Sequence, residues 1–277
     1  MTLLQAAILG IVEGLTEFLP VSSTGHLILA SHAMGLTGDA VKRFQIVIQA
    51  GALLAVVWLY RGRVAELLLG AVSPHPRGRA LLLRLLVAFL PAAVAGLLFH
   101  RAIEEHLFGP GPVAVALLVG GVGMIAFERW RRARPGAGRL DSVDAIPLAG
   151  ALVIGLAQCV SLWPGTSRAM MTILAALFVG CTPVAAAEFS FLLALPTLGA
   201  ATVFDLARGL DELGSGAAGG VPALAVGLLV SAVVAALAIR SFLGYLTRRG
   251  LEPFGWYRIA LGILLAIWLW PRGGMTP

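Results

Sequence analysis

The sequence predicts an all-α integral membrane protein, and three observations support this. Of its 277 residues, 59% are hydrophobic and 12% are charged, whereas soluble domains are about one quarter charged. The hydrophobic residues form long apolar stretches separated by short polar segments, which is typical of membrane helices. Glycine occurs 34 times, and small residues are common where helices pack closely in lipid. A soluble globular fold is therefore excluded.

The apolar stretches fall into two similar sets. They lie at about 3–19, 25–36, 44–60, 80–99 and 113–128, and again at about 146–162, 168–180, 186–204, 222–240 and 257–270. A spanning helix needs about 20 residues, so the last three stretches of each set are long enough to cross. The first two of each set are short or interrupted by Pro20 or Pro164. Because proline blocks the preceding helical turn, each such pair is expected to enter the bilayer without crossing it.

The two sets align as copies of one another. Residues 10–13 (GIVE) match residues 155–158 (GLAQ), with an offset of 158 − 13 = 145. Residues 44–55 match residues 189–200 with the same offset, 189 − 44 = 145. This nearly constant offset predicts an internal duplication, although coincidental hydropathy would give a similar pattern.

Between these segments the two prolines indicate an offset that is smaller by one. Aligning Pro20 with Pro164 also aligns Ser23 with Ser167. Three crossings per copy is an odd number, so the copies are expected to insert in opposite directions. The predicted fold has six transmembrane helices plus two re-entrant helix pairs. It forms a single membrane domain over residues 1–277, made of two inverted repeats at about 1–130 and 146–272.

Loop charge predicts the orientation. Arginines follow Tyr60 and Glu128 in two clusters: Arg61, Arg63, Arg77 and Arg79, then Arg129, Arg131, Arg132, Arg134 and Arg139. The positive-inside rule places both clusters in the cytoplasm, the second as the loop that joins the repeats. The net charge of +6 is then explained by topology, and no nucleic-acid partner is expected. The first broken pair would enter from outside and the second from the cytoplasm.

The first broken pair carries an unusual polar segment, residues 13–26, EGLTEFLPVSSTGH. Glu13 and Glu17 are four residues apart, so a helix places both carboxylates on one face. In a low dielectric they repel unless one is protonated or a cation lies between them. A hard cation such as Mg²⁺ or Ca²⁺ prefers oxygen ligands and would also bind phosphate. The alternative is a solvated helix face at the membrane surface.

The hydroxyls and the imidazole of this segment suggest hydrolytic chemistry. Ser22, Ser23 and Thr24 can cap the second helix of the pair and can bind phosphate. Ser23 is the preferred nucleophile, with His26 as its base or as the alternative nucleophile. A packed polar residue without a chemical role is the other interpretation of His26.

The second broken pair carries residues 158–172, QCVSLWPGTSRAMMT. Arg168 is interpreted as the only basic residue deep in an apolar stretch, where arginine costs about 2.5 to 3.5 kcal/mol on insertion scales. It should therefore have an anionic ligand, or a structural ion pair with Glu13, Glu17 or Glu188. Helix N-termini and arginine both bind phosphate well. The predicted phosphate site thus comprises Arg168 with Gly165, Thr166 and Ser167, and Ser23 should lie within a phosphate's width of Arg168.

These segments resemble the signatures of a known family. EGLTEFLPVSSTGH resembles the first signature of the bacterial undecaprenyl-diphosphate phosphatases of the bacitracin-resistance type, which has Glu or Gln, three residues, then Glu. WPGTSRAMMT is similar to their second signature, Pro-Gly-x-Ser-Arg-Ser-x-x-Thr, and AAAEFSFLLALP to the segment that follows it. One departure is Ala169, where the family usually has a second serine. Alanine at this position would remove a hydroxyl from the phosphate site.

The resemblance implies an enzyme of the bacterial inner membrane with its site open to the outer, periplasmic face. It would hydrolyse undecaprenyl diphosphate to undecaprenyl phosphate and inorganic phosphate, recycling the lipid carrier for cell-wall polymers. It implies a divalent cation, Mg²⁺ or Ca²⁺, bound by Glu13 and Glu17, and a polyprenyl diphosphate substrate within the membrane lipids. The chain could act as a monomer or as a homodimer.

Two other classes of function remain open. Inverted repeats with re-entrant helices also build secondary transporters and lipid flippases, in which Glu13 and Glu17 would bind a coupling ion and Arg168 the transported anion. A phosphotransferase would pass the phosphate to another lipid instead of to water.

Overall fold

The computed structural model describes residues 1–107, 109–134, 139–214 and 219–269, and these residues are predominantly helical. The helices are α1 (Leu3–Thr16), α2 (Ser23–Ala33), α3 (Asp39–Leu59), α4 (Arg61–Val72), α5 (Pro76–Leu107), α6 (Pro110–Arg132), the 3-10 turn η1 (Val143–Ala145), α7 (Leu148–Val160), α8 (Arg168–Val179), α9 (Pro183–Gly214), α10 (Gly220–Arg249) and α11 (Glu252–Leu269). Within the described ranges the only β pairing is one bridge, between Leu140 and Cys181. The all-α prediction is confirmed.

Five helices of the described chain are long and apolar enough to cross a membrane: α3, α5, α6, α9 and α10. They coincide with five of the six crossings predicted from the sequence. The sixth, α11, has 18 residues and carries Glu252 and Arg258, and it is not among the five. The second predicted repeat also extends over residues 270–272, and the joining loop over 135–138, both of which lie outside the described residues.

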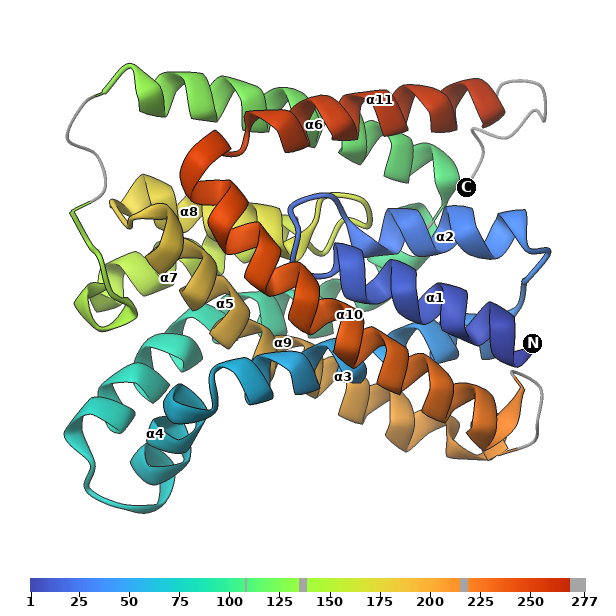
Figure 1. The fold of residues 1–277 in the computed structure, drawn as a ribbon, viewed down its shortest axis with the longest axis horizontal. Helices are drawn as coiled ribbons and strands as arrows, with labels where there is room; N and C mark the ends of the chain where they lie inside the picture. Colours follow the sequence, from blue (N-terminus) through green and yellow to red (C-terminus); the bar gives the residue numbers. More distant parts are fainter. Residues whose placement is uncertain (108, 135–138, 215–218, 270–277) are drawn as a thin grey trace.

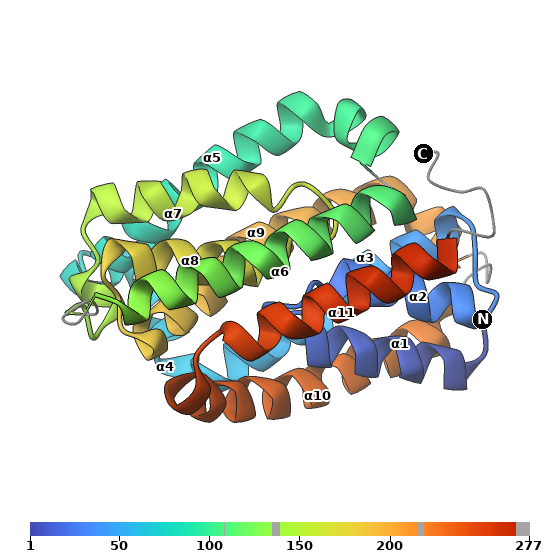
Figure 2. The ribbon, with the colours of Figure 1, turned by 90° about the horizontal axis from the view of Figure 1, so that it is seen from above.

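The short helices enter the molecule from opposite ends. In Figure 1, α1 runs from the right-hand end to the centre and α2 returns to the same end, while α7 and α8 do the same from the left. Seen from above, α6 and α11 lie side by side (Figure 2), and they are in contact along their length. The two interrupted segments, at residues 17–22 and 161–167, therefore meet near the middle of the molecule.

Glycines allow each first short helix to pack tightly on a helix of the other half. A Cβ on Gly10 of α1 would collide with the backbone of Gly227 in α10, and one on Gly155 of α7 with the backbone of Ala88 in α5. Gly10 and Gly155 are related by the repeat offset, 155 − 10 = 145. The same close approach thus occurs twice, once in each half.

The two interruptions share one capping geometry. Ser22 (φ 75°) and Ser167 (φ 72°) are the only non-glycine residues with positive φ in the described chain. Each caps the following helix by accepting a hydrogen bond from the N–H three residues on, that of Gly25 (3.3 Å) or Met170 (3.2 Å). Ser22 is therefore the counterpart of Ser167, with the unchanged offset 167 − 22 = 145.

Two sequence expectations about the interruptions are corrected by this geometry. Ser23 does not match Ser167, because the repeat offset places it opposite Arg168, and these two residues begin α2 and α8. Nor does Pro20 end the first helix. α1 ends at Thr16, and Glu17 is its C-cap, still helical, with its N–H bonded to the carbonyl of Glu13 at 2.9 Å. Glu13 and Glu17 keep the predicted one-turn spacing.

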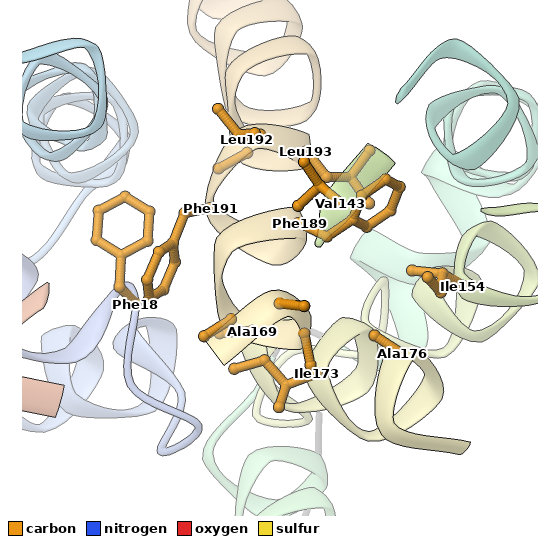
Figure 3. Close-up of a cluster of buried hydrophobic side chains, with 14 of the residues drawn as sticks. Phe18, Val143, Ile154, Ala169, Ile173, Ala176, Phe189, Phe191, Leu192 and Leu193 are labelled. Carbon is orange, nitrogen blue, oxygen red and sulfur yellow. The ribbon is translucent and has the colours of Figure 1, made fainter. Parts of the chain in front are cut away.

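An apolar cluster holds the interruptions against α8 and α9. Figure 3 shows Phe18, from the first interruption, facing Phe191 of α9, and their rings meet edge to face with centroids 5.3 Å apart. Ala169 and Ile173 of α8 are completely buried in the same cluster. Such aromatic pairs add about 0.5 to 1.5 kcal/mol beyond area burial. The turn that carries Glu17 is thus anchored to the second half of the chain.

The arginine-rich segments gather at one end of the molecule. α4, which the sequence analysis had treated as loop, lies at this end together with the start of α5 and the ends of α6 and α10 (Figure 1). Arg63 of α4 bonds to Asp144 at 2.9 Å and to Glu188 at 3.3 Å. Glu188, one of the three ion-pair partners considered for Arg168, therefore pairs with Arg63 instead.

Candidate active site

Glu17 connects the two halves of the predicted site. One carboxylate oxygen, Oε2, accepts a hydrogen bond of 2.6 Å from the Ser23 hydroxyl, and the other, Oε1, accepts one of 3.0 Å from the Arg168 guanidinium. The side chains of Glu17 and Arg168 are only 5% and 8% exposed, so solvent screens this ion pair weakly. The predicted proximity of Ser23 and Arg168 is confirmed, since both bind one carboxylate.

Arg168 is oriented by further contacts. Its Nη1 donates to the backbone carbonyl of Ser190 at 2.9 Å, and its guanidinium carbon lies 5.7 Å from the centre of the Phe18 ring. The Ser190 hydroxyl in turn pairs with Thr172 at 2.7 Å. The Nε of Arg168 is buried and has no partner among the described residues. One strong donor of Arg168 is therefore free for an anionic ligand.

Two helix N-termini converge at Glu17. Ser23 and Arg168, which both bind Glu17, are the first residues of α2 and α8. In the described chain, the N–H groups of Ser23 and Thr24 in α2, and of Arg168 and Ala169 in α8, make no hydrogen bond. Free N–H groups and the positive ends of two helix dipoles favour a bound anion.

Glu13 is buried beside this pair, and its charged neighbours are Glu17 and Arg168. It is 0% exposed, and among the described residues neither of its carboxylate oxygens has a hydrogen-bond partner. An isolated buried carboxylate is costly. Two carboxylates one turn apart, one of them orphaned, fit the oxygen-only preference of a hard divalent cation.

Only two carboxylates are available for such a cation. The described residues contain no group of three or more His, Cys, Asp or Glu side chains arranged to hold a metal. Mg²⁺ is usually bound by one or two carboxylates together with water and substrate phosphate. The residues present therefore fit a cation that is completed by its substrate, and do not form a closed metal site.

Both nitrogens of His26 are already engaged. Nδ1 lies 2.7 Å from the carbonyl of Ser22 and Nε2 lies 2.6 Å from the hydroxyl of Tyr257. Because a carbonyl only accepts, the Ser22 contact places the proton on Nδ1, and Tyr257 then donates to Nε2. The Ser23 hydroxyl instead donates to Glu17. In this arrangement Glu17 is the base closest to Ser23.

The other predicted phosphate ligands lie close to Glu17 in the two interruptions, and most of their hydroxyls are hydrogen-bonded within the protein. The hydroxyls of Ser22 and Ser167 cap α2 and α8. The Thr166 hydroxyl donates to Trp163 O at 2.6 Å and to Val160 O at 3.1 Å, which satisfies the end of α7. Gly165 has φ +99° and its missing Cβ leaves room for α6. For the Thr24 hydroxyl, which is partly exposed, the described residues offer no hydrogen-bond partner.

The departure from the family signature at Ala169 does not affect the anion site. The side chain of Ala169 is 0% exposed and packs in the apolar cluster with Ile173 (Figure 3). A serine hydroxyl at this position would point into the same cluster. The sequence-based expectation of a lost phosphate contact is therefore not supported by the geometry.

One buried cation was missed in the sequence analysis. Arg258 of α11 is 0% exposed, so Arg168 is not the only basic residue deep in an apolar stretch. The same rule on buried arginine applied to the stretch at 257–270 would have identified it. Tyr257 and Ser190 were also missed as partners, because an isolated hydroxyl in an apolar run gives no sequence signal. Thr172 is the last residue of the second signature, but no role was predicted for it.

A large cavity lies elsewhere. It has a volume of about 830 Å³ between the ends of α6 and α10 and the start of α11, and its lining includes Arg131, Arg249 and Trp256. None of the predicted site residues line it. The buried ionic cluster, with its unpartnered groups, remains the stronger candidate for chemistry.

Two interrupted helices that direct their N-termini at a buried serine, carboxylate and arginine define a helical membrane protein with an internal candidate site for an anion. The chain matches the family model described as bacitracin resistance protein BacA over residues 6–264. It belongs to this family.

Several known relatives are similar over nearly the whole chain. The undecaprenyl-diphosphatase of Sorangium cellulosum is 57% identical over 265 residues, covering 96% of this chain and 85% of the relative. That of Thermoanaerobacter sp. is 45% identical and covers 96% of both chains. Undecaprenyl-diphosphatase 2 of Rhodospirillum rubrum is 47% identical, covering 97% of this chain and 95% of the relative.

Proposed function

We propose that this chain is an undecaprenyl-diphosphate phosphatase. It hydrolyses undecaprenyl diphosphate to undecaprenyl phosphate and inorganic phosphate, which recycles the lipid carrier for cell-wall polymer synthesis. The observation that carries the proposal is the shared Glu17 carboxylate, which joins a serine hydroxyl to an arginine at two converging helix N-termini. The relatives named undecaprenyl-diphosphatase support the substrate.

Ser23 is the proposed nucleophile and Glu17 its base. The Ser23 oxygen attacks the terminal phosphorus of the diphosphate while its proton moves along the 2.6 Å hydrogen bond to Glu17. The bond from that phosphorus to the bridging oxygen breaks, and undecaprenyl phosphate leaves. Glu17 passes this proton to the departing undecaprenyl phosphate and is a carboxylate again. Water then attacks the phosphorus of the phosphoserine and gives a proton to Glu17. The bond from that phosphorus to the Ser23 oxygen breaks, the serine oxygen takes up the proton from Glu17, and inorganic phosphate is released. General bases of this kind contribute about 10² to 10⁴ in rate.

Arg168 and the two helix starts bind the terminal phosphate. The unpartnered Nε of Arg168 and the free N–H groups at Ser23 and Ala169 provide donors without any rearrangement. Such preorganised donors stabilise the charge that develops on phosphoryl oxygens. The remaining sequence-predicted phosphate ligands, Ser22, Thr24, Gly165, Thr166 and Ser167, shape these two turns.

Glu13 and Glu17 are the residues that would hold a divalent cation, Mg²⁺ or Ca²⁺. When bound, it would neutralise charge on the diphosphate. The formal charges of Glu13, Glu17, Arg168 and Arg258 sum to zero, so a bound diphosphate adds negative charge that these side chains do not offset. His26, held by Ser22 and Tyr257, forms the wall of the site next to Ser23.

The proposed architecture is six transmembrane helices plus two re-entrant pairs, in two inverted repeats joined by the arginine-rich cytoplasmic loop. It is supported by the opposite entry of α1–α2 and α7–α8 (Figure 1) and by the matching serine caps. The protein would lie in the bacterial inner membrane with its site open to the periplasm. The proposal holds for a monomer as well as a homodimer.

The test is phosphate release by the purified protein from undecaprenyl diphosphate, with and without a chelator. We expect turnover that the chelator abolishes and that added Mg²⁺ or Ca²⁺ restores. The same protein in liposomes separates the alternatives. Lipid or ion flux without phosphate release would identify a transporter or flippase, and labelled phosphate appearing on a second lipid would identify a phosphotransferase.

A further inference from the structure

The guanidinium of Arg258 joins the two interrupted segments. Nη1 donates to the carbonyl of Pro20 in the first interruption at 3.4 Å, and Nη2 donates to the carbonyl of Gly165 in the second at 2.9 Å. Nη2 also donates to the carbonyl of Ala116 in α6 at 3.0 Å. One planar group therefore ties both turns to a continuous helix.

In the described part of the chain, every hydrogen-bond partner of Arg258 is a neutral carbonyl. No carboxylate of the described residues lies within ion-pair distance of it, and its Nε has no partner. Taking a guanidinium out of water carries a large free-energy cost. Three hydrogen bonds to main-chain carbonyls offset only part of this cost, so a purely structural role does not account well for an arginine at this position. Only a forked, planar donor can reach acceptors on different segments at once.

The position of these carbonyls connects Arg258 to the reacting groups. Pro20 lies three residues from both Glu17 and Ser23, and Gly165 lies three residues before Arg168. Fixing the two carbonyls relative to each other fixes the separation of Ser23 and Arg168, which otherwise meet only through Glu17. Reacting groups that are displaced by about 1 Å can lose about 10²-fold in rate.

We propose that Arg258 is a positioning residue that holds the two halves of the phosphate site in register through Pro20 and Gly165. The inference rests on the proposed phosphatase function. It assigns Arg258 an action through the backbone of both turns, without contact with the substrate.

The chain contains a matched control for this contact. Arg84 also donates only to backbone carbonyls, those of Ile146 at 2.6 Å and Asp144 at 2.8 Å, and ties α5 to η1 far from the two interruptions. Lysine at either position keeps the charge and the aliphatic stem but loses the fork. Arg258→Lys and Arg84→Lys therefore remove the same kind of contact at different places.

The first measurement is kinetic, with farnesyl diphosphate as a soluble substrate. We expect Arg258→Lys to lower kcat about 10- to 100-fold with KM little changed, and Arg84→Lys to keep kcat within about twofold. A raised KM at unchanged kcat would show that the guanidinium acts on substrate binding and not on the placement of the reacting groups. That result would overturn the proposal, as would full activity of Arg258→Lys.

The second measurement is amide hydrogen exchange, which does not depend on activity. Arg258→Lys should raise exchange in residues 17–22 and 161–167 together, and Arg84→Lys should raise it only around residues 143–146. Unchanged exchange in either interruption of Arg258→Lys would refute the tie. If the unmodified protein releases no phosphate, the proposed function fails, while the exchange result still decides whether the tie exists.

A second variant covers the case in which Arg258→Lys does not fold. A Cβ at Gly120 of α6 would collide with Nη2 of Arg258, whereas one at Gly123 meets nothing within 4 Å. Gly120→Ala should displace the guanidinium and reproduce both effects, and Gly123→Ala should not. Equal behaviour of the two alanine variants would contradict the proposal.

Discussion

At the scale of single residues, the site depends on the way Glu17 divides its two oxygens. One oxygen orients the Ser23 hydroxyl and the other neutralises Arg168, so in the proposed mechanism the carboxylate is both a base and a counter-ion. An arriving phosphate offers Arg168 a second anion, which would free Glu17 to take the serine proton. Substrate binding and activation of the nucleophile are then coupled through one side chain.

Glu17→Gln should therefore cost more than a lost ion pair. An amide keeps the shape but has only one accepting oxygen and is not a base, so we expect kcat to fall about 100-fold or more. Phosphate release in detergent measures this. Glu188→Gln is the control, because Glu188 pairs with Arg63 at the arginine-rich end and its loss should leave kcat within about twofold. Comparable losses in both variants would contradict the assignment.

Arg168→Ala should abolish phosphate release while the protein still folds. The variant removes the donor to Glu17 and the unpartnered Nε beside the anion site. It also leaves Glu17 buried and unpaired, which costs about 3 to 5 kcal/mol, so the melting temperature should drop as well. Adding Glu17→Gln to Arg168→Ala should restore part of the melting temperature but none of the activity. Turnover of farnesyl diphosphate by a folded Arg168→Ala protein would refute the role.

The sequence predicted these residues because glutamate, serine and arginine are conspicuous in apolar runs. It did not predict which residue lies close enough to Ser23 to act as its base. The assignment of His26 as the base came from its nearness in sequence to Ser23, whereas Ser22 O and Tyr257 occupy both of its nitrogens in the fold. Arg258 could have been identified from its place in an apolar stretch, but its contacts could not. Its partners are main-chain carbonyls, which every residue has and no sequence distinguishes.

At the scale of elements, the two interruptions are built by backbone conformation more than by proline. Ser22 and Ser167 adopt positive φ and cap the next helix with their own hydroxyls. Prolines marked where the helices break but gave the wrong register between the repeats. Helix existence was predictable because apolar stretches of about 20 residues have few alternatives in a membrane. α4 was not predicted, because its arginines and glutamate resemble a loop.

Gly165→Ala tests the second interruption as an element. Gly165 has φ +99° and its Cβ would collide with Val113 O and Ala116 of α6, whereas Gly180 has φ +106° and open space around it. Gly180→Ala should cost about 1 to 2 kcal/mol for the left-handed conformation alone. Gly165→Ala should cost about 2 to 5 kcal/mol, because overpacking is added. Thermal unfolding in detergent measures both, and equal losses would show that the approach of α6 does not matter.

At the scale of the whole molecule, the two proposed repeats would form one asymmetric site from two similar halves. Ser23 and Arg168 occupy equivalent positions, as do Glu13 and Gln158, with offsets of 168 − 23 = 145 and 158 − 13 = 145. Gln158 is completely buried like Glu13, but it carries no charge. The first half thus supplies the two carboxylates and the proposed nucleophile, and the second half supplies the guanidinium of Arg168. A symmetric arrangement would place either two serines or two arginines opposite each other.

The orientation of this asymmetric site in the membrane is the last prediction, and α3 offers a direct test. Its 21 residues are long enough to cross the hydrocarbon core at about 1.5 Å per residue. Asp39 at its start is 80% exposed, and Gly62 just after its end has open space around it. Asp39→Cys and Gly62→Cys should therefore report on opposite sides of the bilayer.

In intact cells a membrane-impermeant maleimide should label Asp39→Cys and spare Gly62→Cys, which should react only after permeabilisation. The two native cysteines interfere little with this labelling. Cys159 is replaced by alanine, and Cys181 is 1% exposed, with burial raising the pKa of its thiol to about 11, so little reactive thiolate forms at pH 7. Asp39 is the first residue of α3, and α1 and α2 enter from the end of the molecule where α3 begins (Figure 1). Labelling of Asp39→Cys from outside would therefore put the carboxylates and the proposed nucleophile within reach of the periplasm. Labelling of Gly62→Cys in intact cells would reverse the orientation and place the site's entrance in the cytoplasm.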